Sequence, residues 1–448
     1  MRTAACYQLG SVSKTAPPPG YQRLRYSNTL SRVLSGRIVA FLRIPDQESV
    51  GLIIPAGPQK TTLSYWRACN RNSLFASSWL DSKWYSLPVR SANDFGQLCV
   101  ETSGPESTIL STIHSEYARA SGATTNVALH LTEQDVEQIL TMPMAIEAVD
   151  EAFRQLGSGQ AENLPRRRLH SAKGMMHLMA ASLPCSGYFG YKTYTVFPER
   201  VQFTACLYSS ENGELLALIE ADRLGQIRTG AASGVATRWM ARVDTRVVGV
   251  IGAGRQAFTQ VEAVCQVRPV NQVLAYSRTP DRLAQFCRET QELLGVLCHA
   301  ANSADEVAAA SDVLITITNS TVPVFKGESL KPGTHINAAG SNFLIKRELD
   351  ETCIRRCRSI VVDSKDQARM ECGEFLGPLQ KGRLTWDQIR ELSEVVTARS
   401  LPRTDPKDIT LFKSLGVALE DVAVAAKVYE IAREQKVGRM MEYGGNGG

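Results

Sequence analysis

The sequence has few of the features that build metal or nucleic-acid sites. Its six histidines show no paired ligand spacing, and its eleven cysteines are spread almost singly. The one close pair, Cys353 and Cys357, lacks the second pair or the histidine that a zinc site needs, so we expect reduced thiols and no metal. The net charge of +5 comes from scattered residues without a basic tract mixed with aromatics, so nucleic acid is not expected as a partner.

Long apolar runs are also missing, and acidic residues are absent from the beginning of the chain. No run approaches the roughly 20 residues that cross a bilayer, and no secretory apolar segment is present, so we expect a cytoplasmic protein without a membrane partner. Residues 1–45 contain seven Arg or Lys and no Asp or Glu, which is typical of a mitochondrial or other organellar transit peptide. A disordered or mis-assigned leader is the alternative, and we favour it. The apolar residues that would share one helical face there are Leu30, Val33, Leu34, Ile38, Phe41 and Leu42.

The remaining length and composition predict more than one domain. With 448 residues, of which 44% are hydrophobic, the chain can bury at least two cores. Residues 1–126 show little periodicity and are predicted to be an N-terminal extension without an assigned function. A regular pattern begins at Leu131, where Thr132 and Asp135 form a capping-box-like helix start that apolar residues continue to Gly157.

The pattern then changes from antiparallel strands to alternating strands and helices. The turn sequences PCSG and ENGE separate four β-prone segments, which predicts an antiparallel sheet; the segments are MMHLMAASL, GYFGYKTYTVF, FTACLYSS and ELLALIEA. The small-residue segment IRTGAASGVATRWMAR predicts a helix. From residue 245 to 364 strand-like and helix-like segments alternate, which predicts a parallel sheet.

The first strand of that alternation ends in a glycine-rich turn. The segment VVGVIGAGRQA places Gly252, Gly254 and Ala257 in a G-x-G-x-x-A pattern between a strand and a helix. Gly252 allows a tight turn, Gly254 lets the backbone approach a pyrophosphate, and Ala257 lets the helix pack closely on the strand. Arg255 and Gln256 lie at the amino end of that helix, which favours anions. We therefore predict a dinucleotide site rather than a simple turn.

The end of the second strand bears on the choice of cofactor. An NAD enzyme usually offers Asp or Glu there to the ribose hydroxyls, whereas Arg278 can pair with a 2′-phosphate, so NADP is favoured over NAD. A solvated Arg278 is the alternative. Thr316 and Thr318 end another strand and should lie near the cofactor, because ligands gather at the carboxyl ends of parallel strands. The residues at the end of the second strand are Ser277, Arg278 and Thr279.

Three more segments, RTGAASGVAT, HINAAGSNFLIKREL and ITLFKSLGVALEDVAVA, follow a recognisable order together with the glycine turn. Over roughly residues 127–437 the chain resembles the ornithine cyclodeaminase and mu-crystallin family. The resemblance implies an α/β fold in which a Rossmann-type parallel-sheet domain is inserted in a second α+β catalytic and dimerisation domain, and it implies a homodimer. The implied stretches are 127–240 and 363–440 for the catalytic and dimerisation domain and 241–362 for the dinucleotide-binding domain.

The same resemblance implies a site for the carboxylate of an amino or imino acid. Its residues would be Arg167, Lys192 and Arg228, with the register among Arg166, Arg167 and Arg168 uncertain by one. Two guanidinium groups can clamp a carboxylate and a lysine can bind the nitrogen or move a proton, so Lys192 and Arg228 are also the predicted catalytic residues. An ordinary salt bridge is the alternative for any one of them alone.

The family chemistry is hydride exchange at the carbon that carries nitrogen next to the carboxylate. Cyclodeaminases need an acid just after the I-N-A-x-G turn, and the aligned residue here is Asn342, which cannot take up a proton. This favours an imine reductase or amino-acid dehydrogenase. A lyase that uses another acid, Glu348 or Asp350, and a non-enzymatic NADP-dependent binder of small ligands remain alternatives. Ser414 and Gly416, in the FKSLG segment, are expected beside the nicotinamide.

Overall fold

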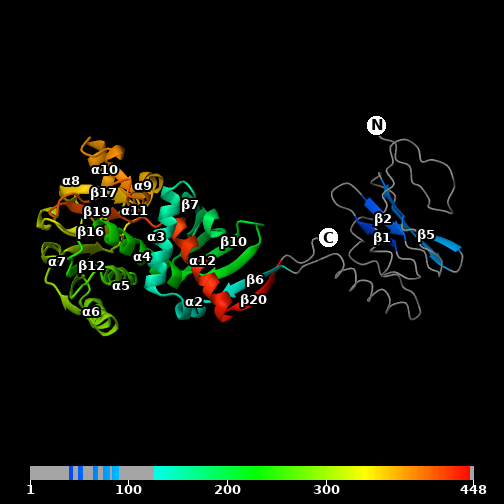
Figure 1. Cartoon of the computed structure of the whole chain (residues 1–448), viewed down its shortest axis with the longest axis horizontal. Coiled ribbons are helices and arrows are strands. Elements are labelled where there is room, and N and C mark those ends of the chain that lie inside the picture. The colour runs from blue at the N-terminus through cyan, green and yellow to red at the C-terminus, as the bar shows by residue number, and fades with distance from the viewer. Residues whose placement is uncertain are drawn as a thin grey trace. The chain divides into compact units, whose positions relative to one another are not determined.

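The computed structural model describes residues 126–443 and, before them, the backbone of five strands. The chain divides into two compact units, residues 126–443 and residues 1–125 with 444–448 (Figure 1). In the N-terminal unit β1, β2 and β3 form an antiparallel sheet and β4 pairs with β5. Most of the predicted transit peptide lies outside the described residues, but Phe41 and Leu42 lie in a strand, so the helical prediction is wrong for them. The strands are β1 (Ala40–Arg43), β2 (Ser49–Ile53), β3 (Ser64–Ala68), β4 (Leu74–Leu80) and β5 (Lys83–Val89).

The first sheet of residues 126–443 has seven strands in the order β20-β6-β11-β10-β9-β8-β7. The predicted antiparallel sheet is confirmed for β8 to β11, and only β6 and β11 pair in parallel. Strand β7 was not predicted, because its sequence ENLPRRRLH has no apolar alternation. The strands are β6 (Asn126–Leu131), β7 (Glu162–His170), β8 (Met175–Leu183), β9 (Tyr188–Phe197), β10 (Arg200–Ser209), β11 (Leu215–Glu220) and β20 (Arg439–Tyr443).

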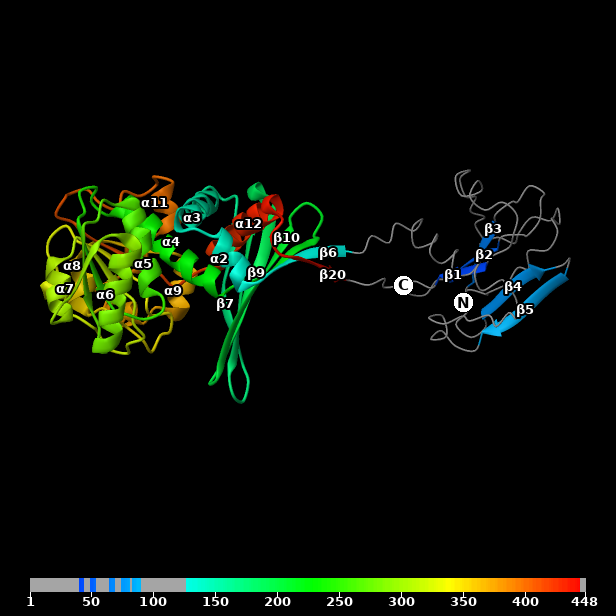
Figure 2. The same cartoon turned by 90° about the horizontal axis from the view of Figure 1, so that it is seen from below.

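Helices cover the inner face of this sheet and supply its core. The predicted capping box is confirmed, because Thr132 and Asp135 exchange hydrogen bonds at the start of α2. The single predicted helix is in fact two, which are separated at Leu140 and Thr141, because Pro143 lacks an amide hydrogen and fits only in the first turn of a helix. Helix α12 packs across β7 to β10 (Figure 2). The helices are α2 (Glu133–Ile139), α3 (Met142–Gly157), α4 (Asp222–Met240) and α12 (Ala418–Gln435), and a short 3-10 turn, η3 (Pro184–Ser186), links β8 to β9.

The second sheet has eight strands, all parallel, in the order β14-β13-β12-β15-β16-β19-β17-β18. The α/β fold class with a Rossmann-type parallel sheet is thus confirmed. The sheet extends beyond residue 362, because β18 and β19 pair within it, while the division of residues 127–440 into three stretches stays a prediction. The strands are β12 (Val247–Ile251), β13 (Gln272–Tyr276), β14 (Leu297–Ala300), β15 (Val313–Thr316), β16 (His335–Ala338), β17 (Cys357–Val362), β18 (Ile389–Glu391) and β19 (Ile409–Lys413).

Short helices flank the parallel strands on both faces. None of the helices in the described part of the chain has the length and hydropathy of a membrane span. The helices are α5 (Ala257–Val267), α6 (Pro280–Leu294), α7 (Ala304–Ala310), α8 (Glu351–Arg356), α9 (Lys365–Glu371), α10 (Gly373–Gln380) and α11 (Leu392–Val396), with 3-10 turns η4 (Gly327–Ser329) and η5 (Trp386–Gln388).

Candidate active site

The glycine turn after β12 has the geometry of an anion cradle. Gly252 has φ +110°, and a Cβ there would meet the carbonyl oxygen of Ile317 at 2.6 Å, so a side chain is excluded. Gly254 has no atom within 4 Å of the place a Cβ would take, which leaves space for a ligand against the backbone. Within the described residues, no hydrogen bond uses the amides of residues 254–256. The turn therefore fits a pyrophosphate at the amino end of α5.

The other residues predicted around the dinucleotide differ in burial and in whether their side chains already have partners. Ala257 is fully buried at the start of α5, directly after Gln256. The guanidinium of Arg255 is already engaged by Asp222 of α4, at 2.6 and 2.8 Å. At the end of β13 the Ser277 hydroxyl accepts the amide of Thr279, whereas Arg278 is exposed and has no ion pair among the described residues.

Lys192 and Arg228 lie together in a buried cluster of charges. Lys192, on β9, is 2% exposed, and its Nζ lies 2.8 Å from Oδ1 of Asp421. Arg228, on α4, pairs with Glu420 at 2.5 Å and with Asp421 at 3.0 Å. Gly416 (φ +77°) lies against this guanidinium, since a Cβ on it would meet Nη1 at 2.7 Å. The predicted pair is thus held by two neighbouring acids of α12.

Burial and pairing shift the proton affinities of this cluster. Desolvation lowers the pKa of Lys192, although Asp421 works against that change. Desolvation raises the pKa of Glu420 to about 8, with Arg228 opposing it. Burial disfavours the charge of Arg228, but Asp421 and Glu420 raise its pKa overall. The pKa of Lys192 is therefore below, and that of Glu420 above, the value of the same side chain in water.

The arginine that joins the cluster from β7 is Arg166, not Arg167. Arg166 is 4% exposed and donates to Glu371 at 2.6 Å and to the carbonyls of Leu415 and Gly416 at 3.1 and 2.7 Å. Arg167 is exposed on the other face of the sheet, so the register expected from the sequence is corrected by one residue.

A β-bulge explains this shift. Leu164 pairs with Ala180, and regular pairing would place Arg167 opposite His177, which is buried on the inner face. One extra residue between Leu164 and Arg167 places Arg168 opposite His177 instead. Arg168 therefore also points inward, where it pairs with Glu371 at 2.5 Å.

The predicted FKSLG segment forms the opposite wall of the cluster. It begins in β19, between β16 and β17, and the Asp363 carboxylate accepts the amides of Leu415 and Gly416 at 2.6 and 2.7 Å. Burial raises the pKa of Asp363 to about 6, against the effect of these hydrogen bonds. Ser414 is buried, and its amide donates to the carbonyl of Ala338 at 3.0 Å. These hydrogen bonds within the fold hold the FKSLG segment in place.

The hydroxyls of Thr316 and Thr318 hold the loops at the carboxyl ends of the parallel strands. Both donate to the buried carboxylate of Glu348, at 2.9 and 2.7 Å, and Glu348 also accepts the amide of Gly340. Asp350 caps α8 by accepting the amide of Cys353 at 2.7 Å. Glu348 and Asp350, the two acids considered as substitutes at the Asn342 position, are therefore both engaged within the fold.

Asn342 lies in the loop beside the β7 arginines. Its carbonyl accepts from Arg168 at 3.0 Å, and the Arg168 guanidinium lies 4.3 Å from the centre of the Phe343 ring. The buried imidazole of His177 stacks on Tyr194 with ring centres 4.0 Å apart. Desolvation, followed by Arg168, lowers the pKa of His177 to about 3, so this ring is neutral at physiological pH.

The glycine turn and the charged cluster adjoin each other through Phe203 of β10. Nζ of Lys192 lies 5.3 Å from the centre of this ring, and the Arg255 guanidinium lies 5.9 Å from it. The cluster therefore lies beside the place where a dinucleotide would enter, as ligands do at the carboxyl ends of parallel strands.

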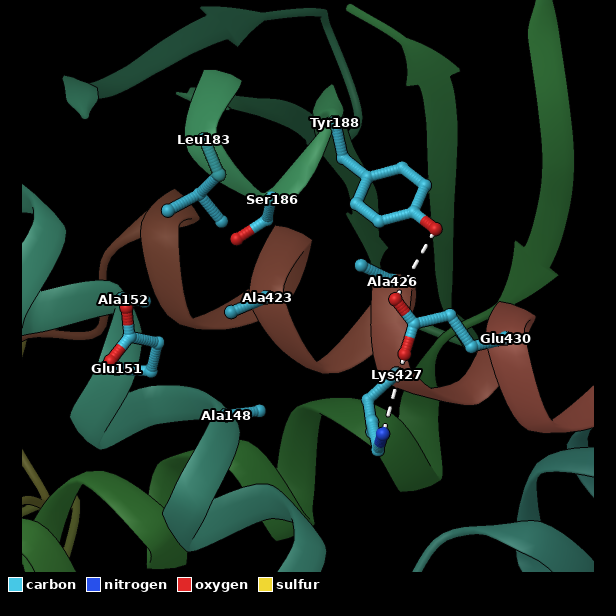
Figure 3. A pocket seen from close by; sticks show the side chains of 10 residues that line it. All are labelled: Ala148, Glu151, Ala152, Leu183, Ser186, Tyr188, Ala423, Ala426, Lys427 and Glu430. Carbon is cyan, nitrogen blue, oxygen red and sulfur yellow. Dashed lines mark hydrogen bonds and ion pairs between the residues drawn. The ribbon is translucent and has the colours of Figure 1, made fainter. Parts of the chain in front are cut away.

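A separate cavity of about 200 Å³ lies between α3, α12 and η3. Figure 3 shows Tyr188 and Lys427 pointing at the carboxylate of Glu430 there, over a floor of alanines. No residue of the charged cluster lines it, so we do not place the active site in this cavity.

Several residues of the site were missed from the sequence. Glu420 and Asp421 could have been noticed, because these two acids interrupt the apolar first half of α12, and buried acids need partners. Glu371 and Asp363 gave no such signal, since they lie in the mixed segment VDSKDQARME.

Fold and site together define a dinucleotide-binding α/β protein with a buried, cation-rich cluster beside the glycine turn. Residues 126–436 match the model of the ornithine cyclodeaminase/mu-crystallin family. The chain belongs to this family.

Known relatives are similar over nearly their whole length. Alanine dehydrogenase of Archaeoglobus fulgidus is 35% identical over 326 residues, which cover 70% of this chain and 98% of that protein. The solved Delta(1)-pyrroline-2-carboxylate reductase of Thermococcus litoralis, in complex with NADH and L-proline, is 36% identical with a TM-score of 0.67, and the match covers 69% of this chain and 99% of that one. An archaeal alanine dehydrogenase dimer with bound NAD is 35% identical with a TM-score of 0.67, over 71% and 100% of the two chains. These structures support a nicotinamide cofactor for this chain.

Proposed function

We propose that this chain is a nicotinamide-dependent oxidoreductase acting on C–N bonds, as an imine reductase or an amino-acid dehydrogenase. The observation that carries the proposal is the buried cationic cluster beside the glycine turn. Two of the most similar relatives are a reductase of a cyclic imino acid and an amino-acid dehydrogenase, which supports the same substrate class.

The balance of charge in the cluster favours a carboxylate ligand. In the ion pairs of the cluster four cations face three carboxylates, and the nearby Asp363 carboxylate is held by backbone amides, so the paired groups carry one positive charge in excess when all are ionised. We assign the carboxylate to Arg166, Arg228 and Lys192, whose cationic groups can bind it with charge-assisted hydrogen bonds. The cations are Arg166, Arg168, Lys192 and Arg228, and the carboxylates are Glu371, Glu420 and Asp421.

The substrate nitrogen is assigned to Lys192 and Asp421. Oδ2 of Asp421 is buried without a hydrogen-bond partner and can accept from an N–H group of the substrate. The pKa of Lys192 is lowered by burial, so its ammonium gives up a proton to an imine nitrogen more readily than an exposed lysine would. When bound, the nicotinamide supplies or accepts the hydride, and the chain orients the substrate and moves the proton.

The test is a substrate panel on the full-length protein. NADPH and NADH are assayed against cyclic imino acids, and NADP and NAD against amino acids. Cofactor turnover equal to product formed is the expected result. Lys192→Met should lose most turnover while still binding cofactor. Tight cofactor binding without turnover of any substrate would instead favour the non-enzymatic binder.

The second candidate function is a lyase, and the reaction with ornithine distinguishes it from the oxidoreductase. Asn342 offers no acid, and Glu348 and Asp350 are held by the fold, so ornithine should be a poor substrate. Ammonia release from ornithine without net change in cofactor absorbance, at rates comparable to imine reduction, would place the lyase first.

We further propose NADP as the preferred cofactor. The support is Arg278, which is exposed at the end of β13 and has no ion pair among the described residues, so its guanidinium is available to a 2′-phosphate. Both cofactors should be compared under the same conditions.

We also propose a homodimer formed through the outer face of the antiparallel sheet. That face carries exposed large apolar side chains, which a monomer rarely leaves uncovered. The expected result in sedimentation is a dimer at micromolar concentration. The apolar residues are Leu169, Met176, Leu178, Phe189 and Phe197.

A further inference from the structure

A second cavity lies at the opposite edge of the parallel sheet. Its volume is about 690 Å³, and it is lined by the end of α8, the amino-terminal halves of β17 and β18, and the 400–404 loop. Helices α8 and α10 and strand β17 lie at the end of the unit away from β6 and β20 (Figure 1). The glycine turn is at the carboxyl ends of the strands, so the dinucleotide and substrate of the proposed function do not reach this cavity.

Arginines dominate the lining of this cavity, and most of them lack a close acidic partner. Among the described residues, no carboxylate lies within 4.0 Å of three of the five, and Arg390 reaches only Glu394 at 3.9 Å. Arg383 is the exception, because it pairs with Glu351, which is also held by Lys381 at 2.6 Å. The five arginines are Arg355, Arg356, Arg358, Arg383 and Arg390.

Local structure explains only part of this charge. Arg355 and Arg356 lie in the last turn of α8, where cations offset the helix dipole, and Arg356 also donates to the carbonyls of Gly327 and Glu328. Neither explanation applies to Arg358 or Arg390, which lie on neighbouring parallel strands and are both exposed. The lining also holds two acids, Glu351 and Asp387, and Asp408 lies close enough to Arg358 to interact with it, so the five arginines leave a net positive charge that a bound anion would offset.

We propose that this cavity binds a phosphorylated small molecule. Planar guanidinium groups match phosphate oxygens with paired hydrogen bonds, and several of them can share a diphosphate. The floor of the cavity includes Ile360, Leu384 and Pro402, which offers an apolar surface to the non-phosphate part of the ligand. Arg358 lies on β17 five residues before Asp363, which corresponds to about 17 Å of strand. Asp363 accepts the amides of Leu415 and Gly416, so β17 connects the proposed ligand to the FKSLG segment of the candidate active site.

The test is a titration of the full-length protein with pyrophosphate, ATP and inorganic phosphate. Calorimetry is done in 150 mM NaCl, which screens weak surface attraction, and with saturating NADH, which keeps these probes out of the glycine turn. The variant is Arg358→Glu with Arg390→Glu. Arg288→Glu, an exposed arginine on α6, is the matched control. We expect binding of pyrophosphate or ATP by the wild type and the control, and a loss of at least about tenfold in affinity in the double variant, since charge-assisted contacts are removed.

The comparison of ATP with pyrophosphate shows which part of the ligand is recognised, and the comparison of the double variant with the wild type decides the proposal. Tighter binding of ATP than of pyrophosphate means that the apolar floor also contributes, and equal binding means that phosphate alone is recognised. Equal affinity in the double variant and the wild type, or no binding at millimolar concentration, overturns the proposal. Because the double variant supplies the comparison, the result does not depend on the proposed oxidoreductase activity.

Discussion

The loss of the buried Glu371 carboxylate should cost the protein much of its stability. It lies on α9, is fully buried, and joins Arg166 and Arg168 of β7 at 2.6 and 2.5 Å, with Gln367 donating a third hydrogen bond at 2.5 Å. Glu371→Gln keeps the shape and one acceptor oxygen but leaves the buried guanidinium of Arg166 and the partly buried guanidinium of Arg168 without their counter-charge. Removing one partner of a buried ion pair costs about 3–5 kcal/mol, so we expect at least about 3 kcal/mol of lost stability.

The assay is urea denaturation of the full-length variant, with Glu351→Gln as the matched control. Glu351 also joins two cations, Lys381 and Arg383, but in solvent, so its loss should matter little. We further expect a carboxylate ligand or sulfate to stabilise Glu371→Gln more than the wild type, because the anion replaces the missing charge. Equal stability of the two variants would refute the reasoning.

Three more predictions concern the cofactor and pH. Gly254→Val should abolish nucleotide binding, measured by fluorescence titration, while circular dichroism stays unchanged, because a side chain would fill the open space beside the backbone. Ser277→Asp should lower the ratio of kcat/KM with NADPH to kcat/KM with NADH by at least about tenfold, since a carboxylate repels a 2′-phosphate. A wild type that already prefers NADH would contradict the role of Arg278. Because burial raises the pKa of Glu420 to about 8, above its unfolded value, its protonated form favours folding, and that contribution is lost as pH rises through about 8. Denaturation midpoints from pH 6 to 9 should therefore fall less steeply in Glu420→Gln than in the wild type.

Part of the structure was predictable because it depends on local pattern. Strands such as β12 and β15 are apolar runs rich in β-branched residues, and the glycine turn needs Gly252 and Gly254 for reasons confined to a few residues. The capping box at Thr132 is equally local. Strand β7 was missed because its arginines hide the alternation that identifies other strands.

The sequence by itself determined the α/β class and the dinucleotide turn, since these follow from short-range spacing and from a family pattern, and the family pattern also predicted Lys192 and Arg228 as members of one site. Tertiary structure alone decided which β7 arginine enters that site, because a one-residue bulge reverses the faces of the strand. It also decided which acids neutralise the cations. Glu371 is 205 residues from Arg166, and Asp421 is 229 residues from Lys192, and such pairings arise from the packing of one sheet and its helices against another rather than from local spacing.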